Sequence, residues 1–513
     1  MTDSKKATMV LIMSTLAFTV CFAVWTMNGV LATFLVDRGV FRWDKAQLGW
    51  LIGIPVLSGS IMRLPVGILT DRYGGRIVYT ALMVIAGVMT FFTSAADSYG
   101  SFLIASLGFG LSGASFAVGI AYTSIWFPQA KQGTALGIFG AGNAGSAVTA
   151  IFAPRLLLYF TDNGANLEGW RQLPKIYGVA LLIMAVLFYL LTHSRRVEGA
   201  ASKTLLQRLE PLKYLRVWRF GLYYFFVFGG FVALSQWLIP YYVSVYAMSI
   251  ATAGLLASTF SFPSGVIRAL GGWMSDKFGA RPVMYWVLGS CIVACGLLAI
   301  PRMEIESPGE GVMATKPGVV TEITENQIVV GDFTYPYRNR SMISGSYRSI
   351  DDVESGILVL PQSTFWQEPT VAVGDKVSRR QLLAKGVTHI FFQANIWIFT
   401  VLVFIVGIMM GIGKAAVYKY IPEYFPNDVG VVGGIVGVVG GLGGFVCPVI
   451  FGYFLRETGI WTTTWIFLFW IAIVCLAWLH LVARGLIRTE SPHLLEKLQA
   501  RLHSGHAPIG KGN

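Results

Sequence analysis

The stretch S-G-S-I-M-R-L-P-V-G-I-L-T-D-R-Y-G-G-R, from Ser58 to Arg76, decides the fold of this chain. Its first arginine, Arg63, lies inside an apolar run long enough to cross a lipid bilayer, and a charged turn rich in glycine follows. A charged side chain at the centre of a bilayer costs about 2.5 to 3.5 kcal/mol on insertion scales and is kept where it faces a protein cavity. Arg63 is therefore predicted to line a binding site.

The same pattern recurs from Ser264 to Arg281 as S-G-V-I-R-A-L-G-G-W-M-S-D-K-F-G-A-R, at a constant offset of 205 residues. The matched pairs are Arg63 with Arg268, Gly67 with Gly272, Asp71 with Asp276, Gly74 with Gly279, and Arg76 with Arg281. Chance rarely preserves so many charged and glycine positions without a gap. Two equivalent arginines in two halves indicate a secondary transporter, whose site lies near the middle of the membrane between its repeats.

The composition places the chain among membrane proteins with several spans. Of its 513 residues, 55% are hydrophobic and 13% are charged, which is far too apolar for a soluble protein of this size. The net charge of +13 would suggest a nucleic-acid partner in a soluble chain, but here the cations can satisfy the positive-inside rule. We therefore expect the chain to lie in a lipid bilayer and to bind no nucleic acid.

The sequence gives no indication of an enzyme, a metal site or a cofactor. All five cysteines lie within apolar spans, so they indicate neither disulfides nor a metal cluster. No set of nucleophile and base is recognisable. The apolar run after Lys6 is too long for the core of a signal peptide, so we expect the first helix to remain in the protein.

Apolar windows of roughly 20 residues predict twelve transmembrane helices. The windows are 8–35, 48–70, 77–95, 102–126, 133–157, 173–191, 218–245, 251–274, 283–300, 390–420, 430–455 and 463–482. The expected fold class is an all-α membrane protein of two pseudo-symmetric six-helix bundles with a small β-rich insert outside the cytoplasm. Its parts would be an N-terminal bundle (1–192), a basic cytoplasmic linker (193–217), spans 7–9 (218–300), the insert (301–388), spans 10–12 (389–484) and a cytoplasmic tail (485–513).

Positive charges in short loops predict the orientation. Arg72 and Arg76 follow span 2, Lys277 and Arg281 follow span 8, and further Lys and Arg residues fill the linker. We expect these loops and both termini to lie in the cytoplasm of a bacterium, so that the chain crosses the inner membrane. The basic linker would form an amphipathic surface helix.

The insert breaks the symmetry between the two halves. Its alternating stretches V-V-T-E-I and I-V-V-G-D-F-T-Y, separated by Gly and Pro, predict short strands and hairpins. The stretch from Val371 to Gly386 resembles one edge of a barrel-sandwich domain of the biotinyl or lipoyl type, but no lysine lies in a recognisable modification hairpin. We therefore expect a small β module without a bound cofactor.

The twin turns Gly67–Arg76 and Gly272–Arg281 share the pattern G-x-x-x-D-[RK]-x-G-x-R. A carboxylate at a helix end and arginines across the turn can form ion pairs that latch neighbouring helices, whereas plain positive-inside loops would explain the charges but not the glycines. The pattern resembles the signature loop of the major facilitator superfamily. The predicted cytoplasmic gate consists of Asp71, Arg72, Arg76, Asp276, Lys277 and Arg281.

Arg63 and Arg268 need a counter-charge. Buried carboxylates would give both arginines a structural role, but Asp71, Asp276 and Glu423 fall at helix ends and the span interiors hold no evident Asp or Glu. A guanidinium suits a flat oxyanion because it offers paired, charge-assisted N–H···O bonds. The two arginines therefore predict a bound anion.

Spans 5 and 11 are rich in glycine, as in G-A-G-N-A-G (140–145) and G-G-L-G-G-F (440–445). Small residues let helix backbones approach closely, which serves tight packing and also suits helices that rock against each other. Asn143 adds a polar amide that can donate to an anion. The glycines that we single out are Gly140, Gly142, Gly145, Gly440, Gly441, Gly443 and Gly444.

With the arginine pair and these glycine-rich signatures, the chain resembles the nitrate/nitrite porter family of the major facilitator superfamily over all twelve spans, the insert excluded. The resemblance implies that Arg63 and Arg268 clamp the substrate. It also implies that Asn143 of span 5, Phe116 of span 4 and Tyr224 of span 7 complete the site. Flat aromatic rings could sandwich a planar ion.

Lys414 is a further candidate from the sequence itself. Aligning Trp126-Phe127-Pro128 with Tyr424-Phe425-Pro426, at an offset of 298 residues, places Lys414 of span 10 opposite Phe116. Pseudo-symmetry then predicts that Lys414 faces the cavity rather than snorkelling to the headgroups. A desolvated ammonium near two fixed cations gives up its proton more readily. Its segment G-I-G-K-A-A-V-Y-K resembles the subgroup thought to couple nitrate to protons, so Lys414 is the candidate for proton coupling.

We therefore expect a secondary carrier of nitrate, and of nitrite, that works by alternating access as a monomer. Lys414 favours nitrate/proton symport, whereas the absence of a carboxylate in the membrane favours nitrate/nitrite exchange. Two alternatives from other classes stay open: a carrier of another small organic anion, and a nitrate sensor whose insert signals to a partner outside the cytoplasm.

Overall fold

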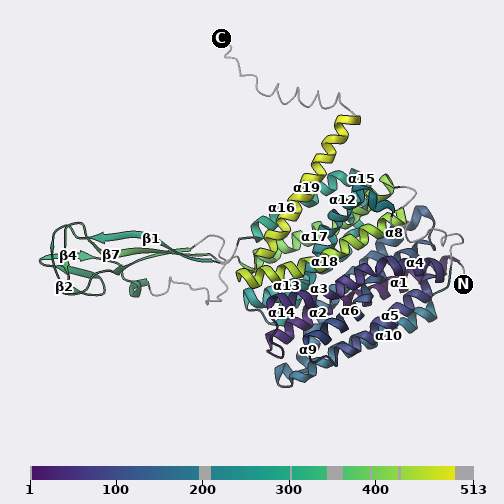
Figure 1. Cartoon of the computed structure of the whole chain (residues 1–513), viewed down its shortest axis with the longest axis horizontal. Helices are drawn as coiled ribbons and strands as arrows, with labels where there is room; N and C mark the ends of the chain where they lie inside the picture. The colour runs from purple at the N-terminus through teal and green to yellow at the C-terminus, as the bar shows by residue number, and fades with distance from the viewer. Residues whose placement is uncertain are drawn as a thin grey trace, which may run out of the picture. The chain divides into compact units, whose positions relative to one another are not determined.

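The computed structural model describes residues 3–195, 210–300, 303–343, 362–392, 395–425 and 429–490. The chain divides into two compact units, Met1–Ala299 with Leu402–Asn513, and Ile300–Val401 (Figure 1). The first unit is helical, and the second consists mainly of strands. Most of the predicted linker helix and of the predicted tail lies outside the described residues.

The described residues contain eleven helices long and apolar enough to cross a membrane, and a bent pair raises the total to twelve. The eleven are Ser4–Asp37, Lys45–Tyr73, Gly75–Thr93, Tyr99–Ser124, Thr134–Phe160, Leu167–Leu191, Leu215–Tyr246, Ala280–Leu298, Ile396–Tyr424, Val431–Thr458 and Thr463–Arg484. The pair is α14 (Ile250–Val266) and α15 (Arg268–Phe278), which meet at a bend of 46°. With the bent pair counted as one span, this number agrees with the twelve predicted spans.

Many spans are built from shorter elements. In chain order these are α1 (Asp3–Trp25), α2 (Met27–Asp37), α3 (Lys45–Ile61), α4 (Arg63–Tyr73), α5 (Gly75–Thr93), α6 (Tyr99–Phe109), η1 (Gly110–Ala114), α7 (Ser115–Ser124), α8 (Gln129–Gly140), η2 (Ala141–Ala144), α9 (Gly145–Phe160) and α10 (Gln172–Leu191). The later elements are α12 (Leu215–Tyr224), η7 (Phe225–Gly229), α13 (Gly230–Tyr246), α16 (Ala280–Leu298), α17 (Ile396–Tyr424), α18 (Val429–Thr458) and α19 (Thr463–Glu490). The segments η1 and η2 are 3-10 turns and η7 is a π turn, so spans 4, 5 and 7 are irregular at mid-length.

Spans 2 and 8 both break one residue before the arginine, although the sequence predicts continuous helices there. Met62 (φ −70°, ψ −11°) separates α3 from α4, and Ile267 (φ −68°, ψ −7°) separates α14 from α15. In span 2 the break has a covalent cause, because Pro65 lacks the N–H that would bond to the carbonyl four residues earlier. Span 8 has Pro263 inside α14, one turn before its break, and Leu270 at the position equivalent to Pro65. Each arginine therefore begins a helix.

The glycines of the repeated turn have a conformational role. Gly74 (φ 86°) and Gly279 (φ 87°) join α4 to α5 and α15 to α16 with nearly identical backbone angles. Residues with a Cβ rarely adopt this positive φ. The constant spacing of glycine in both turns thus follows from the shape of the turn.

Spans 2 and 11 pack backbone to backbone along α3. A Cβ added to Gly49 would lie 2.3 Å from the carbonyl oxygen of Pro448, and one added to Gly452 would lie 2.4 Å from that of Lys45. By contrast, a Cβ added to Gly67 in α4 or to Gly434 in α18 would meet nothing within 4 Å. The two spans are therefore tightly packed on the side of α3 away from the charged turn, and Gly67 and Gly434 have open space beside them.

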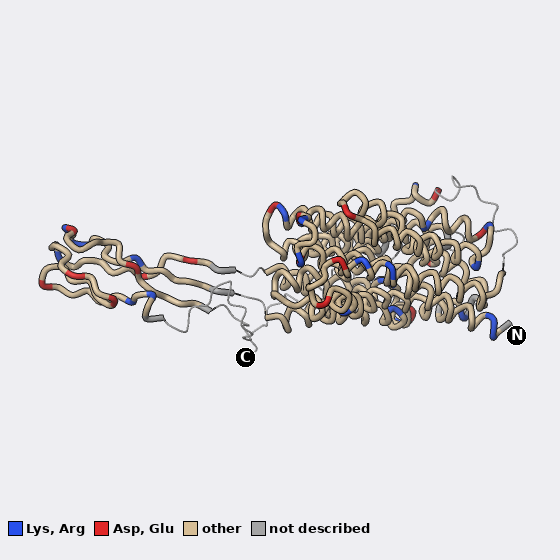
Figure 2. The backbone as a smooth tube through the Cα atoms, turned by 90° about the horizontal axis from the view of Figure 1, so that it is seen from below, with Lys and Arg blue, Asp and Glu red and all other residues tan. Residues whose placement is uncertain are grey.

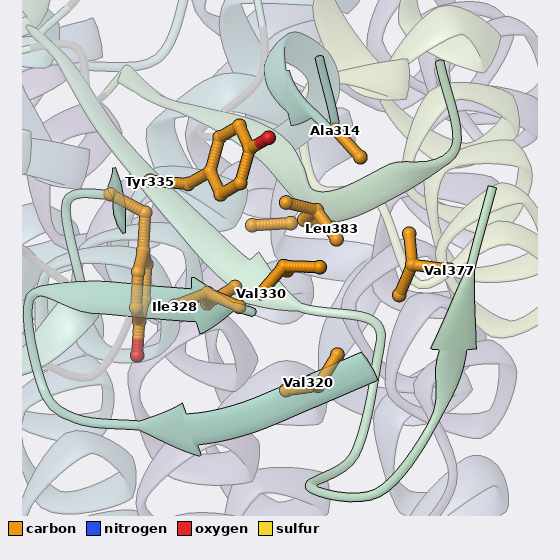
Figure 3. Packing of buried hydrophobic residues seen from close by; sticks show 9 residues of the cluster. Ala314, Val320, Ile328, Val330, Tyr335, Val377 and Leu383 are labelled. Atoms are coloured by element: carbon orange, nitrogen blue, oxygen red, sulfur yellow. The ribbon is translucent and has the colours of Figure 1, made fainter. Parts of the chain in front are cut away.

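The strand unit has two antiparallel sheets. Their strands are β1 (Met303–Met313), β2 (Gly318–Ile323), β3 (Gln327–Val330), β4 (Phe333–Pro336), β5 (Gln362–Pro369), β6 (Lys376–Val377) and β7 (Leu382–Phe392), in the orders β1-β7-β5 and β4-β3-β2-β6. Figure 3 shows the core, in which Val320, Ile328, Val330, Val377 and Leu383 pack together. Strand β7 continues to Phe392 and α17 begins at Ile396, so Ile390, which we predicted to begin span 10, belongs to a strand.

Charge is distributed differently in the two units. In Figure 2 the helical unit is mostly tan with scattered Lys, Arg, Asp and Glu, whereas the smaller strand unit carries several segments of both charges, chiefly near its turns. The strand unit thus has the surface expected of a module in water, and the helical unit has that of a protein in lipid.

Candidate functional site

Arg63 is the first residue of α4 and is 3% exposed. Its Nη1 donates a hydrogen bond of 2.6 Å to the carbonyl oxygen of Gly437 in α18. Its Nε and Nη2, which form one edge of the guanidinium plane, are buried without a hydrogen-bond partner among the described residues. That edge offers two parallel donors, the arrangement that binds a flat oxyanion through two hydrogen bonds.

Arg268 is the first residue of α15 and is half-buried. Its Nη1 is buried and also lacks a hydrogen-bond partner in the described chain. The Arg268 side chain passes close to span 5, since a Cβ added to Gly140 would lie 3.2 Å from its Cδ. Glycine at position 140 therefore leaves the room that this arginine occupies.

The Phe116 ring lies against both arginines. Its centre is 5.2 Å from Cζ of Arg63 and 5.4 Å from Cζ of Arg268. Phe228 of η7 stacks on Phe116 at 6.1 Å and lies 5.0 Å from Cζ of Arg63. The structure thus brings together two arginines and an aromatic ring that the sequence singled out from spans 2, 4 and 8.

The two guanidinium groups have no resident counter-ion in the part of the chain that the structure describes. The ion pairs of the described residues involve other cations, and the groups that interact electrostatically with Arg63 are Arg268 and two tyrosines. Two like charges that interact in this way repel each other. A buried charge without a counter-charge is costly, so the arrangement is suited to an anionic ligand.

Asn143 lies in η2, the 3-10 turn that interrupts span 5, and is fully buried. Its Nδ2 donates to the carbonyl oxygen of Gly140 at 2.9 Å. Because Nδ2 carries two hydrogens, one remains for a ligand. Gly140 in turn lies beside Arg268, so the amide is anchored next to the segment that contacts this arginine.

Tyr224 ends α12 and is completely buried. Its ring stacks on Phe228 at 4.9 Å and meets the Tyr418 ring edge-on at 5.0 Å. It also interacts electrostatically with Arg63. The sequence resemblance named Tyr224, and the structure places it in the aromatic lining beside this arginine.

Tyr418 of α17 belongs to the same lining, but the sequence analysis missed it. Its ring centre lies 5.4 Å from Cζ of Arg268, and its hydroxyl donates to the carbonyl oxygen of Gly433 in α18 at 3.1 Å. One signal could have found it: Tyr418 follows Lys414 by four residues, so the two lie on one helical face.

Lys414 is completely buried and its Nζ has no hydrogen-bond partner among the described residues. Nζ lies 3.5 Å from the ring centre of Phe231, a cation–π contact. Lys414 also interacts electrostatically with Arg268. The sequence placed Lys414 opposite Phe116, and the aromatic ring that the structure gives it is Phe231 of α13.

The singled-out glycines are contact points. In span 11, a Cβ added to Gly440 would lie 2.1 Å from Tyr224 Cδ1, and one added to Gly441 would lie 2.3 Å from Ser60 Oγ. A Cβ added to Gly443 would lie 2.6 Å from the Phe225 carbonyl oxygen, and one added to Gly444 would lie 2.9 Å from the Val232 side chain. In span 5, a Cβ added to Gly142 would lie 2.5 Å from the Phe18 ring, and one added to Gly145 would lie 2.2 Å from the Thr19 carbonyl oxygen. These helices fit their neighbours only without side chains at these positions.

The residues of the predicted gate have various partners. Asp276 accepts a hydrogen bond of 2.6 Å from Lys419 of α17, rather than from a cation of its own turn. Arg76 donates from Nε and Nη2 to the Tyr189 carbonyl at 2.9 and 2.5 Å. Arg72 lies over the Tyr73 ring and Lys277 over the Trp273 ring. Arg281 interacts electrostatically with Tyr420. Asp71 lies half-buried near the end of α4.

Fold and site can be compared with known proteins. A model of the Major Facilitator Superfamily matches residues 13–308 and 381–509. A solved bacterial homologue of the human lysosomal transporter Spinster, in an inward-facing and occupied conformation, has a TM-score of 0.59 at 16% identity and covers 93% of this chain and 97% of its own. The chain therefore belongs to the major facilitator superfamily of membrane carriers.

Two curated relatives narrow this class. The "Probable nitrate/nitrite antiporter NarK1" of Thermus thermophilus is 38% identical over 489 residues, which are 94% of each chain. The "Nitrite extrusion protein" of Bacillus subtilis is 24% identical over 475 residues, which are 91% of this chain and 93% of that one. Within the superfamily the chain belongs to the nitrate/nitrite porters, as its sequence motifs predicted.

Proposed function

We propose that this protein carries nitrate and nitrite across the bacterial inner membrane by alternating access of two six-helix halves. One observation carries the proposal: Arg63 and Arg268, from equivalent spans, lie against one aromatic ring without a carboxylate partner in the described chain. The names of the relatives from Thermus thermophilus and Bacillus subtilis support nitrate and nitrite as the anions.

The free donors define how the ion would bind. Nitrate is flat and its charge is shared among three oxygens. The Nε–Nη2 edge of Arg63 would hold two oxygens, Arg268 Nη1 would hold the third, and the Phe116 ring would lie against the ion. Bound charge would offset the repulsion between the guanidinium groups, so the ion would stabilise the arrangement in which both arginines are close.

This stabilisation is the proposed driving force for closure. Spans 2 and 11 are tightly packed along α3, whereas Gly67 and Gly434 have open space beside them. The cavity would therefore open toward the charged turns. The 46° bend of span 8 separates α15, which carries Arg268, from α14, so α15 could swing toward Arg63 while α14 keeps its contacts.

Coupling would depend on Lys414, whose buried Nζ lies near Arg268 without a hydrogen-bond partner in the described chain. An anion at Arg268 would favour the protonated amine, and release of the anion would favour loss of the proton. This linkage would give nitrate/proton symport. Nitrate/nitrite exchange is the second candidate, since the Thermus relative is named an antiporter.

The remaining architecture is part of the same proposal. The N-terminal half would comprise residues 1–192, and spans 7–12 would form the C-terminal half. The charged turns, the linker 193–217, the tail 485–513 and both termini would lie in the cytoplasm, and the strand insert would lie on the opposite side. The protein would act as a monomer.

A liposome assay tests the function and its coupling together. Purified protein should accumulate nitrate when the outside is acidic, with no nitrite inside. Uptake that requires internal nitrite and ignores the pH gradient would refute symport in favour of exchange. Uptake of formate or oxalate without nitrate would refute the choice of substrate.

A further inference from the structure

A further buried cation lies outside the proposed substrate site. Arg219 of α12 is 5% exposed, although the adjacent Trp218 is 48% exposed and donates from Nε1 to the Leu212 carbonyl at 2.9 Å. An exposed tryptophan near the start of a span is typical of the membrane–water interface, so Arg219 lies at about headgroup depth. An arginine at this depth can extend into water, yet this one is folded into the protein.

Arg219 shares its surroundings with two other unused donors. The Tyr223 hydroxyl, one turn further along α12, and the Tyr420 hydroxyl of α17 are buried without hydrogen-bond partners in the described chain, and so is Nε of Arg219. Phe220 links them: its ring lies 5.1 Å from Cζ of Arg219 and stacks on Tyr420 at 5.2 Å. Arg219 interacts electrostatically with both tyrosines.

These donors face away from the substrate site. In the substrate site, Tyr224 contacts Tyr418. Tyr223 is one residue from Tyr224, and Tyr420 is two residues from Tyr418. In a helix, side chains one or two residues apart point to different faces. On the side of Tyr223, Cys475 of α19 contacts the Leu222 carbonyl. The cluster therefore lies within the C-terminal group of helices, between α12, α17 and α19.

The charged groups around the cluster leave it positive. Arg281 of α16 interacts electrostatically with Tyr420 and with Tyr285, whose hydroxyl is 3.0 Å from Nδ1 of His480. The carboxylate within range of Tyr420 is Glu423, which is exposed and forms no ion pair with Arg219 in the described structure. Buried donors in a positive region favour an acceptor that carries negative charge.

We propose that Arg219, Tyr223 and Tyr420 form a second anion site, which binds a phosphate group at the membrane surface. A phosphate accepts several hydrogen bonds at once and pairs with arginine through two parallel N–H donors. The group belongs either to the headgroup of an acidic phospholipid or to free phosphate, and the headgroup depth of Arg219 suits the lipid. Because α12 continues directly into Tyr224, an occupied site would hold the helix that presents this tyrosine to the substrate.

Thermal unfolding of the full-length purified protein tests the site. Phosphatidylglycerol should raise the melting temperature saturably, and phosphatidylcholine should have the smaller effect at equal concentration. Arg219→Gln should require at least about tenfold more phosphatidylglycerol, since a hydrogen bond to a charged group contributes roughly 1.5 kcal/mol or more. Arg42→Gln removes the same charge from an exposed position between α2 and α3, away from the cluster, and should respond like the parent.

The outcomes distinguish a lipid headgroup from free phosphate, and both from the absence of a site. A saturable shift with inorganic phosphate that is lost in Arg219→Gln assigns the site to free phosphate, and a shift with phosphatidylglycerol alone assigns it to lipid. If Arg219→Gln does not fold, the double variant Tyr223→Phe with Tyr420→Phe keeps the rings and removes the hydroxyls, and it should show the same weakening. The proposal would be overturned if Arg219→Gln and Arg42→Gln responded equally. It would also be overturned by equal effects of both lipids without a phosphate effect, or by no response to any ligand.

Discussion

Gly440 in α18 offers a way to disturb the proposed site without changing any charge. A Cβ at this position would lie 2.1 Å from Cδ1, 2.8 Å from Cγ and 2.9 Å from Cβ of Tyr224. All three distances are below van der Waals contact, so Gly440→Ala must displace the ring from its stack on Phe228. Overpacking of this kind costs about 1 to 3 kcal/mol.

The free energy of this overpacking should appear as weaker binding of nitrate. In the empty protein the Tyr224 ring can move aside, but nitrate binding has to return it to the lining of the site. If binding bears the whole cost, the dissociation constant for nitrate rises about 5-fold to 150-fold. Calorimetric titration of the purified protein measures this change directly.

Gly434→Ala is the matched control, because it adds the same methyl group to the same helix where nothing lies within 4 Å. This variant should bind nitrate as the parent does. Should Gly440→Ala and Gly434→Ala bind with equal affinity, Tyr224 would have no part in the site. A melting temperature of Gly440→Ala far below that of the control would indicate general damage to packing instead.

Two further predictions concern α17. Lys414→Met should abolish the accumulation of nitrate driven by an acidic outside while nitrate counterflow continues, and accumulation at the parent's level would exclude Lys414 from proton coupling. Tyr418→Phe removes the hydrogen bond to the Gly433 carbonyl but keeps the ring beside Arg268, so it should lower unfolding free energy by about 0.5 to 1.5 kcal/mol and change nitrate affinity by less than about threefold. Tyr418→Leu, which also loses the ring, should bind nitrate more weakly than Tyr418→Phe, and equal affinities would show that the ring is unimportant.

The features that the sequence predicted well are those with a local signature. A charge inside an apolar run is visible in any single span, and the offset of 205 residues identifies its counterpart, so Arg63 and Arg268 could be paired without coordinates. Gly74 and Gly279 were recognisable for the same reason, and their positive φ explains why glycine recurs. Apolar windows gave the twelve spans because a helix in lipid must satisfy its own backbone.

Features that depend on distant partners escaped the sequence. Gly437 holds Arg63 through a backbone carbonyl, and every residue has one, so no residue type signals such a contact. Tyr418 resembled any other aromatic residue of a span until its ring was placed beside Arg268. The bend before Arg268 has leucine, not proline, at the position equivalent to Pro65, so the repeat did not reveal it. The burial of Arg219 contradicts its position at the start of a span, where arginines commonly extend into water.

The central claim is that two guanidinium groups hold the anion through their paired donors. Nitrate counterflow in liposomes with Arg63→Lys and Arg268→Lys tests it most directly, because lysine keeps the charge and loses the planar set of donors. Arg42→Lys, at an exposed position between α2 and α3, is the control. Each site variant should raise the half-saturating nitrate concentration at least about tenfold while the control matches the parent. Counterflow in both site variants with the parent's concentration dependence would contradict the account.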